Sequence, residues 1–540
     1  MVKMKKRTMA LVLAVAMGTS LLAGCGKKAA PETAGGQAQS QGEKQQEQSQ
    51  AGNGQQADSE GKKTLTIALA SEIGGLDPVI SVDRYGGNVY LNIYETLMRV
   101  DEKGEIVPNL CTSFEQPDEK TYVFHLPEGV KFHNGEELRA SDVAFSLKRG
   151  IGTKMDYLVG SIDPDSFTTP DDYTVQFSLK SPSGAFLANL TTPQTGILSE
   201  KAVTEAGDQY GLHPIGSGPY KFVSWTKGVS AIVERFEEYH GTAPYYDELV
   251  FKTLPEDTTR TIELESHGVD VATAIAPVDI PRIEESDEFK LITSPTRGLK
   301  WLSFNTQKEP WNNEKVRQAI ALALDTESIT KAVKLGYAET ATSMLSPNVM
   351  YFNPDIPVNE YNVEKAKALL AEAGYPDGLS TTLLVDERTE MQNAGTIIKE
   401  MLAQINVNVD IEVLEWAAFL NKLFDGDMNI FLQSWNCSTP DPDNQFYSTF
   451  HSSMAGSPGG HAHINDKKVD ELLDTAREST VGSEREKLYK ELQQYNYDVK
   501  YWVPLWYDVD YIGTTKEIGD LSLDSGGYHN WFLTQPSAGN

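Results

Sequence analysis

The stretch Ser434-Trp435-Asn436-Cys437-Ser438-Thr439-Pro440-Asp441-Pro442-Asp443-Asn444 decides how the rest of the chain is interpreted. It follows the apolar run 428–432, which predicts a buried strand, and it precedes 445–447, which predicts the first turn of a helix. Strands that end in polar loops flanked by aromatic residues are where α/β folds bind ligands. We therefore expect an α/β fold in which this loop contacts the ligand.

The residues of this loop divide between two roles. We expect ligand contacts from a run that offers an indole, an amide and two hydroxyls: Trp435, Asn436, Cys437, Ser438 and Thr439. Asp441 is a further candidate with a local alternative, because a carboxylate before Pro442 is typical of a helix N-cap followed by proline at the first helical position. Both roles stay open for Asp441.

Length and charge limit the class of protein. A chain of 540 residues is too long for one hydrophobic core, so two or more lobes are expected. The formal net charge of −30 disfavours nucleic acid and anionic membrane surfaces as the main partner, because both repel a negative protein.

The N-terminus predicts export and lipid attachment. A basic segment at 3–7 precedes the apolar run 9–22, which is too short to span a membrane comfortably, and Leu22-Ala23-Gly24-Cys25 follows. This pattern resembles a bacterial lipobox, in which the cysteine is lipidated and the chain is cut just before it. We expect residues 1–24 to be a signal peptide and Cys25 to carry lipid; a plain secretory signal is the alternative.

Residues 25–63 predict a lipidated cysteine followed by a flexible tether. Gln, Gly, Ala, Ser and Lys dominate this segment, so it buries too little apolar surface to fold. Random-coil scaling gives the tether a reach of about 35 Å. We expect an extracytoplasmic protein anchored to the cell membrane, on the periplasmic side or the outer face. The remaining cysteines, Cys111 and Cys437, are expected as free thiols.

The folded part opens with strand alternation over 64–69. A glycine-flanked loop at 81–87 follows, and then a helix-like run from 89 to 97. Tyr85 and Asp83 in that loop are candidates for ligand contact, with solvated loop residues as the alternative.

Residues 122–179 predict a mainly β region that includes one helix capped by Ser141. Further on, Gly216-Ser217-Gly218-Pro219 leads into a predicted strand at 220–225. The spacing does not match a Gly-x-Ser-x-Gly nucleophile elbow, so we interpret it as a tight turn.

A second lobe is expected to begin near residue 291. Within it, residues 299–305 predict a strand, Asn362 predicts the cap of a helix, and the succession of strand, helix and strand over 381–413 predicts a βαβ unit with parallel pairing. Arg388 lies at the end of its first strand and is expected to pair with an anionic group of the ligand. A surface arginine among acids is the alternative. The aromatic segment 501–507 is expected to return to the first lobe.

Several motifs occur in the order found in one family. They include Leu76-Asp77-Pro78, Gly129-Val130-Lys131-Phe132-His133-Asn134-Gly135, Gly216-Ser217-Gly218-Pro219-Tyr220, Phe304-Asn305-Thr306, Val316-Arg317-Gln318-Ala319-Ile320, and Trp435 with Asp441-Pro442. Together they resemble bacterial extracellular solute-binding proteins of family 5, the dipeptide-, oligopeptide- and nickel-binding class that serves ABC importers. The resemblance covers residues 64–535.

The resemblance implies an α/β, two-lobed, periplasmic-binding-protein-like fold of class II (Venus-flytrap). Lobe I would span 64–290 with a mainly β satellite subdomain at about 108–213, lobe II 291–499, and residues 500–540 would return to lobe I. It also implies a protein that is not an enzyme, has no cofactor or metal, and encloses a peptide-like ligand for delivery to ABC permease and ATPase subunits. We expect a monomer that binds no nucleic acid.

Position 438 departs from the family pattern. In peptide-binding members, an aspartate three residues after the matching tryptophan holds the ligand's α-ammonium, whereas this chain has Ser438 there. Asp441 or Asp83 would then have to substitute, or the ligand is a modified peptide such as glutathione, or not a peptide. A peptide-like ligand remains the first choice.

Three other functions stay open. His461-Ala462-His463 on a predicted strand would place two imidazoles on one side, which suits nickel or a metal chelate. Glu284-Glu285 would be the acid pair of a glycosidase-like enzyme. An extracytoplasmic sensor or chaperone would share the fold, and uptake assays in a deletion strain would distinguish it.

Overall fold

The computed structural model describes residues 62–81, 83–101, 103–457 and 459–538. The predicted signal peptide, the predicted lipidation site Cys25 and the predicted tether up to residue 61 lie outside the described residues. None of the helices in the described part of the chain is long and apolar enough to cross a membrane.

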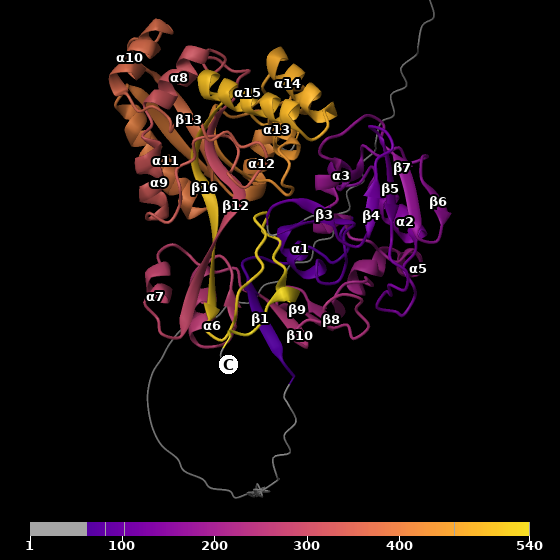
Figure 1. Ribbon diagram of the computed structural model, residues 1–540. Helices are drawn as coiled ribbons and strands as arrows, with labels where there is room; N and C mark the ends of the chain where they lie inside the picture. Colours follow the sequence, from indigo (N-terminus) through magenta and orange to yellow (C-terminus); the bar gives the residue numbers. More distant parts are fainter. Residues whose placement is uncertain (1–61, 82, 102, 458, 539–540) are drawn as a thin grey trace, which may run out of the picture. The chain divides into compact units, whose positions relative to one another are not determined.

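One mixed sheet runs through the described chain, with its strands in the order β14-β13-β15-β12-β16-β11-β1-β10-β9-β8 (Figure 1). Its strands are β1 (Thr64–Leu69), β8 (Tyr220–Thr226), β9 (Ser230–Arg235), β10 (Glu248–Thr253), β11 (Val271–Ala272), β12 (Phe289–Phe304), β13 (Leu379–Asp386), β14 (Val407–Leu414), β15 (Ile430–Asn436) and β16 (Trp502–Thr515). The predicted strands at 64–69 and 220–225 are confirmed.

Helices cover this sheet in groups that follow the chain. The helices that follow the mainly β region in the chain are α5 (Glu200–Ala206), α6 (Asp257–Glu265), α7 (Ile280–Glu284), α8 (Glu314–Leu322), α9 (Thr326–Lys334), α10 (Val363–Glu372), α11 (Thr389–Ala403), α12 (Trp416–Phe424), α13 (Asp443–Phe450), α14 (Lys467–Glu478) and α15 (Ser483–Val499). Asn362 caps α10 by accepting from the Lys365 N–H, as the sequence predicts.

Separate hydrophobic cores make the fold two-lobed. The core of lobe I gathers buried residues from Leu65 to Val271 together with Ile512, Ile518 and Trp531 from the end of the chain. Lobe II has one core between its strands and α8–α11, and another between β12 and α13–α15. The predicted α/β, two-lobed class is confirmed, and its exact domain boundaries stay a prediction.

Strands β12 and β16 connect the two halves of the sheet. β12 pairs antiparallel with β16 from Phe289 to Ser303, and it pairs with β15 from Gly298 to Phe304. β16 pairs at its far end with β11. The sequence predicts a strand only from residue 299, because polar residues and Pro295 hide the alternation before it. Pairing with β16 extends the strand unbroken through the predicted lobe boundary at 291.

The mainly β region is confirmed as an antiparallel sheet of order β4-β5-β7-β6. Its strands are β4 (Ser113–Glu115), β5 (Thr121–His125), β6 (Thr168–Asp171) and β7 (Thr174–Ser178), with α2 (Ala140–Gly150), α3 (Asp156–Val159) and α4 (Phe186–Asn189) nearby in sequence, and the short hairpin β2 (Met98–Val100) and β3 (Ile106–Pro108) before it. The cap predicted at Ser141 is wrong: Arg139 precedes the helix, and its N–H donates to the carboxylate of Asp142.

The segment after β1 differs from its prediction. Helix α1 (Arg84–Tyr90) begins inside the predicted loop 81–87 and stops well before residue 97. Asp83 caps it by accepting from the Gly86 N–H. The helix ends early because the Asn92 amide donates to the carbonyls of Asn88 and Val89, which competes with further helical hydrogen bonds.

The predicted βαβ unit is confirmed. β13 and β14 pair in parallel along their whole length, from Leu379 with Val407 to Asp386 with Leu414, and α11 connects them. β13 also pairs in parallel with β15. The carboxyl ends of β13 and β15 therefore lie at the same edge of the sheet.

Candidate functional site

The polar stretch that opens at Ser434 begins inside a strand. β15 continues to Asn436, so the prediction that the strand ends at residue 432 is wrong. The extra length comes from β12, whose Gly298 pairs with Asn436. Strand alternation places Ser434 and Asn436 on one face of β15, and Trp435 with Cys437 on the other.

The face of Trp435 and Cys437 belongs to the core of lobe II. Cys437 is fully buried in a cluster with Leu299 and Trp301, and Trp435 packs against that cluster. Burial raises the pKa of the Cys437 thiol to about 12. Cys437 and Cys111 are both free thiols. Ligand contact through Trp435 or Cys437 stays a prediction.

Arg297 lies beside the strand end of β15, on the side of Ser434 and Asn436. The sequence analysis did not identify it as a candidate. It sits in a bulge of β12 between Pro295 and Leu299 and is 3% exposed. Its carbonyl accepts from the Cys437 N–H at 3.3 Å, its Nη1 donates to the Ser438 carbonyl at 3.4 Å, and its Nη2 pairs with Asp524 at 2.9 Å. The sequence feature that could have identified Arg297 is a charged residue just before the apolar strand residues that begin at Leu299.

The loop 524–529 joins this strand end to α1. On one side, the Asn436 amide donates to the Gly526 carbonyl at 2.9 Å. On the other side, Nε of Arg84 and the Asn88 amide donate to the Gly527 carbonyl at 3.2 and 2.8 Å. Gly527 has φ +84°, and a Cβ there would lie 2.2 Å from Nε of Arg84, so only glycine fits. The loop therefore contacts both lobes.

Polar atoms at this junction that are buried and have no hydrogen-bond partner among the described residues include Nε of Arg297, Oδ1 of Asn436 and Oγ of Ser438, besides Nε1 of Trp435 on the opposite face and Nδ1 of His529 in the loop. Leaving such an atom unsatisfied costs about 1–3 kcal/mol. The first is a donor, the second an acceptor, and the hydroxyl is both. A bound group that carries a carbonyl and an N–H would satisfy the first three atoms.

Ser438 also has a neighbour from lobe I. Burial raises the pKa of Tyr157 in α3 and Tyr528 raises it further, while the polarity of the nearby Ser438 hydroxyl acts in the opposite direction. No hydrogen bond joins the two hydroxyls within the described chain. Ser438 therefore faces the other lobe.

The second half of the stretch is internal. The carboxylate of Asp441 forms an ion pair with Arg485, whose side chains are 1% and 0% exposed, and it accepts from the Asp443 N–H at 2.9 Å. Thr439 donates to the Asp441 carbonyl at 3.1 Å. Helix α13 begins at Asp443 with Pro442 as its N-cap, one residue later than the capping alternative placed it. Ligand contacts from Thr439 and Asp441 stay predictions.

Arg388 is paired inside the protein. It donates to both carboxylate oxygens of Asp386, at 2.8 and 2.6 Å, and to Oγ of Ser434 at 3.2 Å. Beside it, Glu390 contacts Lys334 at 3.1 Å and Lys300 at 3.7 Å. Burial acts to raise the pKa of Glu390, but these cations and Arg388 outweigh it and lower the pKa to about 2. Contact of Arg388 with a ligand anion stays a prediction.

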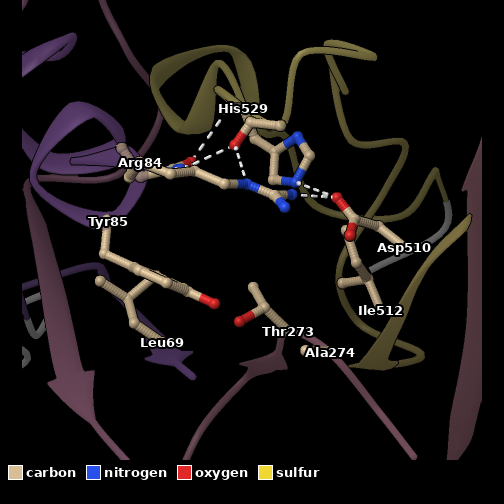
Figure 2. A pocket seen from close by; sticks show the side chains of 10 residues that line it. Leu69, Arg84, Tyr85, Thr273, Ala274, Asp510, Ile512 and His529 are labelled. Carbon is tan, nitrogen blue, oxygen red and sulfur yellow. Dashed lines mark hydrogen bonds and ion pairs between the residues drawn. The ribbon is translucent and has the colours of Figure 1, made fainter. Parts of the chain in front are cut away.

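Tyr85 lines a small cavity with Arg84, Asp510 and His529 (Figure 2). The volume of this cavity is about 30 Å³, far below the roughly 300–1,000 Å³ of ligand pockets. Arg84 pairs with Asp510 there. Asp83 lies instead in a second pocket of about 510 Å³, with Ile80, Leu212 and Trp225 among its walls. The structure thus separates Asp83 from Tyr85.

The residues behind the other functions lie apart from this junction. His461 lies in a turn and His463 follows it outside any helix or strand, so their prediction as strand residues is wrong. Nδ1 of His461 is 2.7 Å from the Gln433 amide. Among the described residues, no group of three or more His, Cys, Asp or Glu side chains is placed to hold a metal ion. Glu284 and Glu285 are exposed at the end of α7.

Lobe II thus has polar atoms without partners among the described residues, and they lie next to a loop that is hydrogen-bonded to lobe I. This arrangement is consistent with a two-lobed protein that binds a solute between its lobes. A family model described as bacterial extracellular solute-binding proteins, family 5 (middle part) matches residues 105–457. The chain belongs to this family, and the predicted resemblance is confirmed.

Individual proteins of known name or structure are similar to this chain over most of its length. The dipeptide-binding protein of Escherichia coli is 31% identical, with 79% of this chain and 85% of the relative covered. A glutathione-binding protein of Pectobacterium atrosepticum is 29% identical, covering 80% and 86%. A periplasmic binding protein of Helicobacter pylori, solved with the peptide STSA, is 28% identical with a TM-score of 0.76, covering 88% and 99%.

Proposed function

We propose that this protein is the solute-binding component of an ABC import system and captures a peptide-like solute between its two lobes. Membership of the extracellular solute-binding family supports the class. A relative named as dipeptide-binding and a neighbour solved with a peptide support the ligand. The relative named as glutathione-binding extends the class to modified peptides.

One observation carries the choice of a peptide-like ligand. The unsatisfied atoms of Arg297, Asn436 and Ser438 comprise a donor, an acceptor and a hydroxyl. A peptide unit offers the complementary carbonyl and N–H in one rigid plane. Tyr85 and Arg388 would contact other parts of the ligand, with Trp435 supporting the strand end from its opposite face.

Several properties belong to the same proposal. The protein binds its solute without chemical conversion, acts as a monomer, and passes the solute to permease and ATPase subunits. After removal of residues 1–24, lipid on Cys25 holds it to the outer side of the cytoplasmic membrane or to the periplasmic side of an envelope. The ordered N-terminal motif supports this anchoring.

Mass spectrometry of the solute released by denaturing the purified protein tests the proposal. A binding protein with a dissociation constant near micromolar, about −8 kcal/mol, retains cargo through purification. We expect peptide-like masses, and re-addition of the identified solute at about one hundred times its Kd should stabilise the protein by about 2.7 kcal/mol. A released sugar, or a metal complex without a peptide unit, would contradict the peptide assignment.

A further inference from the structure

Charged side chains on the elements that adjoin Arg297, Asn436 and Ser438 form ion pairs with one another. The pairs are Arg84 with Asp510, Arg297 with Asp524, Lys300 with Asp508, Lys334 with Glu390, and Arg388 with Asp386. Five cations thus face five carboxylates. The formal charge of this group is zero.

One further ionisable side chain at the junction, the imidazole of His529, is uncharged at neutral pH. His529, which lines the cavity beside Arg84, is 3% exposed. Burial lowers the pKa of its ring to about 4, although Asp510 acts in the other direction, so the ring is neutral.

Because these ion pairs are shielded from water, their lack of net charge affects which ligand groups can bind. The side chains of Arg297, Lys300 and Asp386 are 3%, 7% and 1% exposed. A ligand ammonium or carboxylate enclosed there would either stay unpaired or compete with an existing pair. The effective penalty for burying an uncompensated ion is several kcal/mol.

The buried atoms at the junction that lack hydrogen-bond partners among the described residues do not belong to side chains with an unpaired charge. Oδ1 of Asn436 and Oγ of Ser438 belong to neutral side chains, and the charge of Arg297 is offset by Asp524. Their complement is an uncharged amide that accepts from Nε and donates to Oδ1.

We propose that the ligand group that meets Arg297, Asn436 and Ser438 is uncharged and amide-like, so that the protein selects neutral peptides, cyclic or blocked at their ends, over free zwitterionic peptides. This inference rests on the proposed function, since it specifies the peptide-like ligand further. In this proposal, neutral ligands are preferred because the nearby charged side chains are already paired with one another.

Calorimetry on the intact mature protein, first freed of retained solute, tests this preference. The probes are one dipeptide sequence in three forms: the free dipeptide, the cyclic dipeptide, and the N-acetyl dipeptide amide. We expect at least one neutral form to bind about tenfold or more tightly than the zwitterion. Equal or tighter binding of the free dipeptide overturns this inference and leaves the proposed function standing. Binding of none of the three also overturns this inference, whereas the proposed function is overturned only if the solute released from the purified protein contains no peptide unit.

Ser438→Asp adds a carboxylate at the junction and provides a second test. The probe is the dipeptide amide, which carries only an ammonium, and its affinity should rise about tenfold because an unpaired ligand cation gains a partner. Ser266→Asp, on an exposed residue, changes the net charge equally and should leave all affinities unchanged. If Ser438→Asp, folded by circular dichroism, keeps the preferences of the parent protein, the junction does not meet the ligand's termini and the inference is overturned.

Discussion

The two halves of the stretch 436–443 differ in how their polar groups are satisfied. Asn436 and Ser438 each leave a buried oxygen without a partner among the described residues. Thr439 and Asp441, next along the chain, have their hydroxyl and carboxylate bonded within the protein. Both halves are polar, yet among the described residues only the first half has buried side-chain oxygens without a partner.

The difference separates polar residues that hold the fold from those available for binding. A buried carboxylate with a bidentate guanidinium partner maintains the protein, and removing one partner leaves an unpaired charge. A buried hydroxyl without a partner lowers stability until something binds to it. Substitutions in the two halves should therefore act on different measurements.

Asp441→Asn should have the largest effect and act on stability. It leaves the guanidinium of Arg485, 0% exposed, without its carboxylate, and breaking such a pair costs about 3–5 kcal/mol. Denaturant unfolding measures the loss. Glu484→Gln, in an exposed pair with Lys487 on the same helix, is the control and should cost less than about 1 kcal/mol. A similar small loss from both would contradict a structural role for Asp441.

The buried ring of His461, which contacts β15 through Gln433, should make stability depend on pH. Burial, with a smaller effect of His463, lowers its pKa to about 4, against about 6.5 in the unfolded chain. The unfolded state therefore binds more protons between these values. This contribution is complete above about pH 6.5 and is lost as the pH falls towards 4, on the order of 2 kcal/mol.

Unfolding free energies measured at pH 7 and pH 4.5 check this effect. His461→Gln should make the fall between the two values smaller than in the parent protein. An unaltered fall in His461→Gln would exclude this ring as its source.

Ser438→Ala should have the smallest effect and act on affinity. It removes a hydroxyl that has no partner until the solute binds, so affinity should drop by about 1 kcal/mol while stability stays level or rises slightly. Thr439→Val is the matched variant from the other half, since its hydroxyl is already bonded. It should lose about 1 kcal/mol of stability and keep its affinity. If both variants change the same quantity, the distinction between the halves does not hold.

Local patterns predicted much of the scaffold. Strand alternation located β1, the Asn362 cap located α10, and the strand-helix-strand order identified the parallel pair β13 and β14. Each depends on residues close in the sequence. The extent of β12 was underestimated because its first half is defined by pairing with β16, about two hundred residues further on.

Part of the junction could be predicted from the sequence, and the ligand contacts of its residues stay predictions. Asn436 and Ser438 lie at the junction, but Arg297 and Asp524, which are 227 residues apart, were not identified. Asp441 carried the same sequence signal as a ligand carboxylate, and its partner Arg485 lies 44 residues away. No local pattern contains either pairing.

The sequence by itself determined the family, the α/β class and the position of a polar strand end, because periodicity, caps and ordered motifs are local properties of the chain. Only the tertiary structure decided which polar groups at that strand end remain unsatisfied. Hydrogen bonds and ion pairs are saturable, so the capacity left for a solute depends on partners that folding brings from distant parts of the chain.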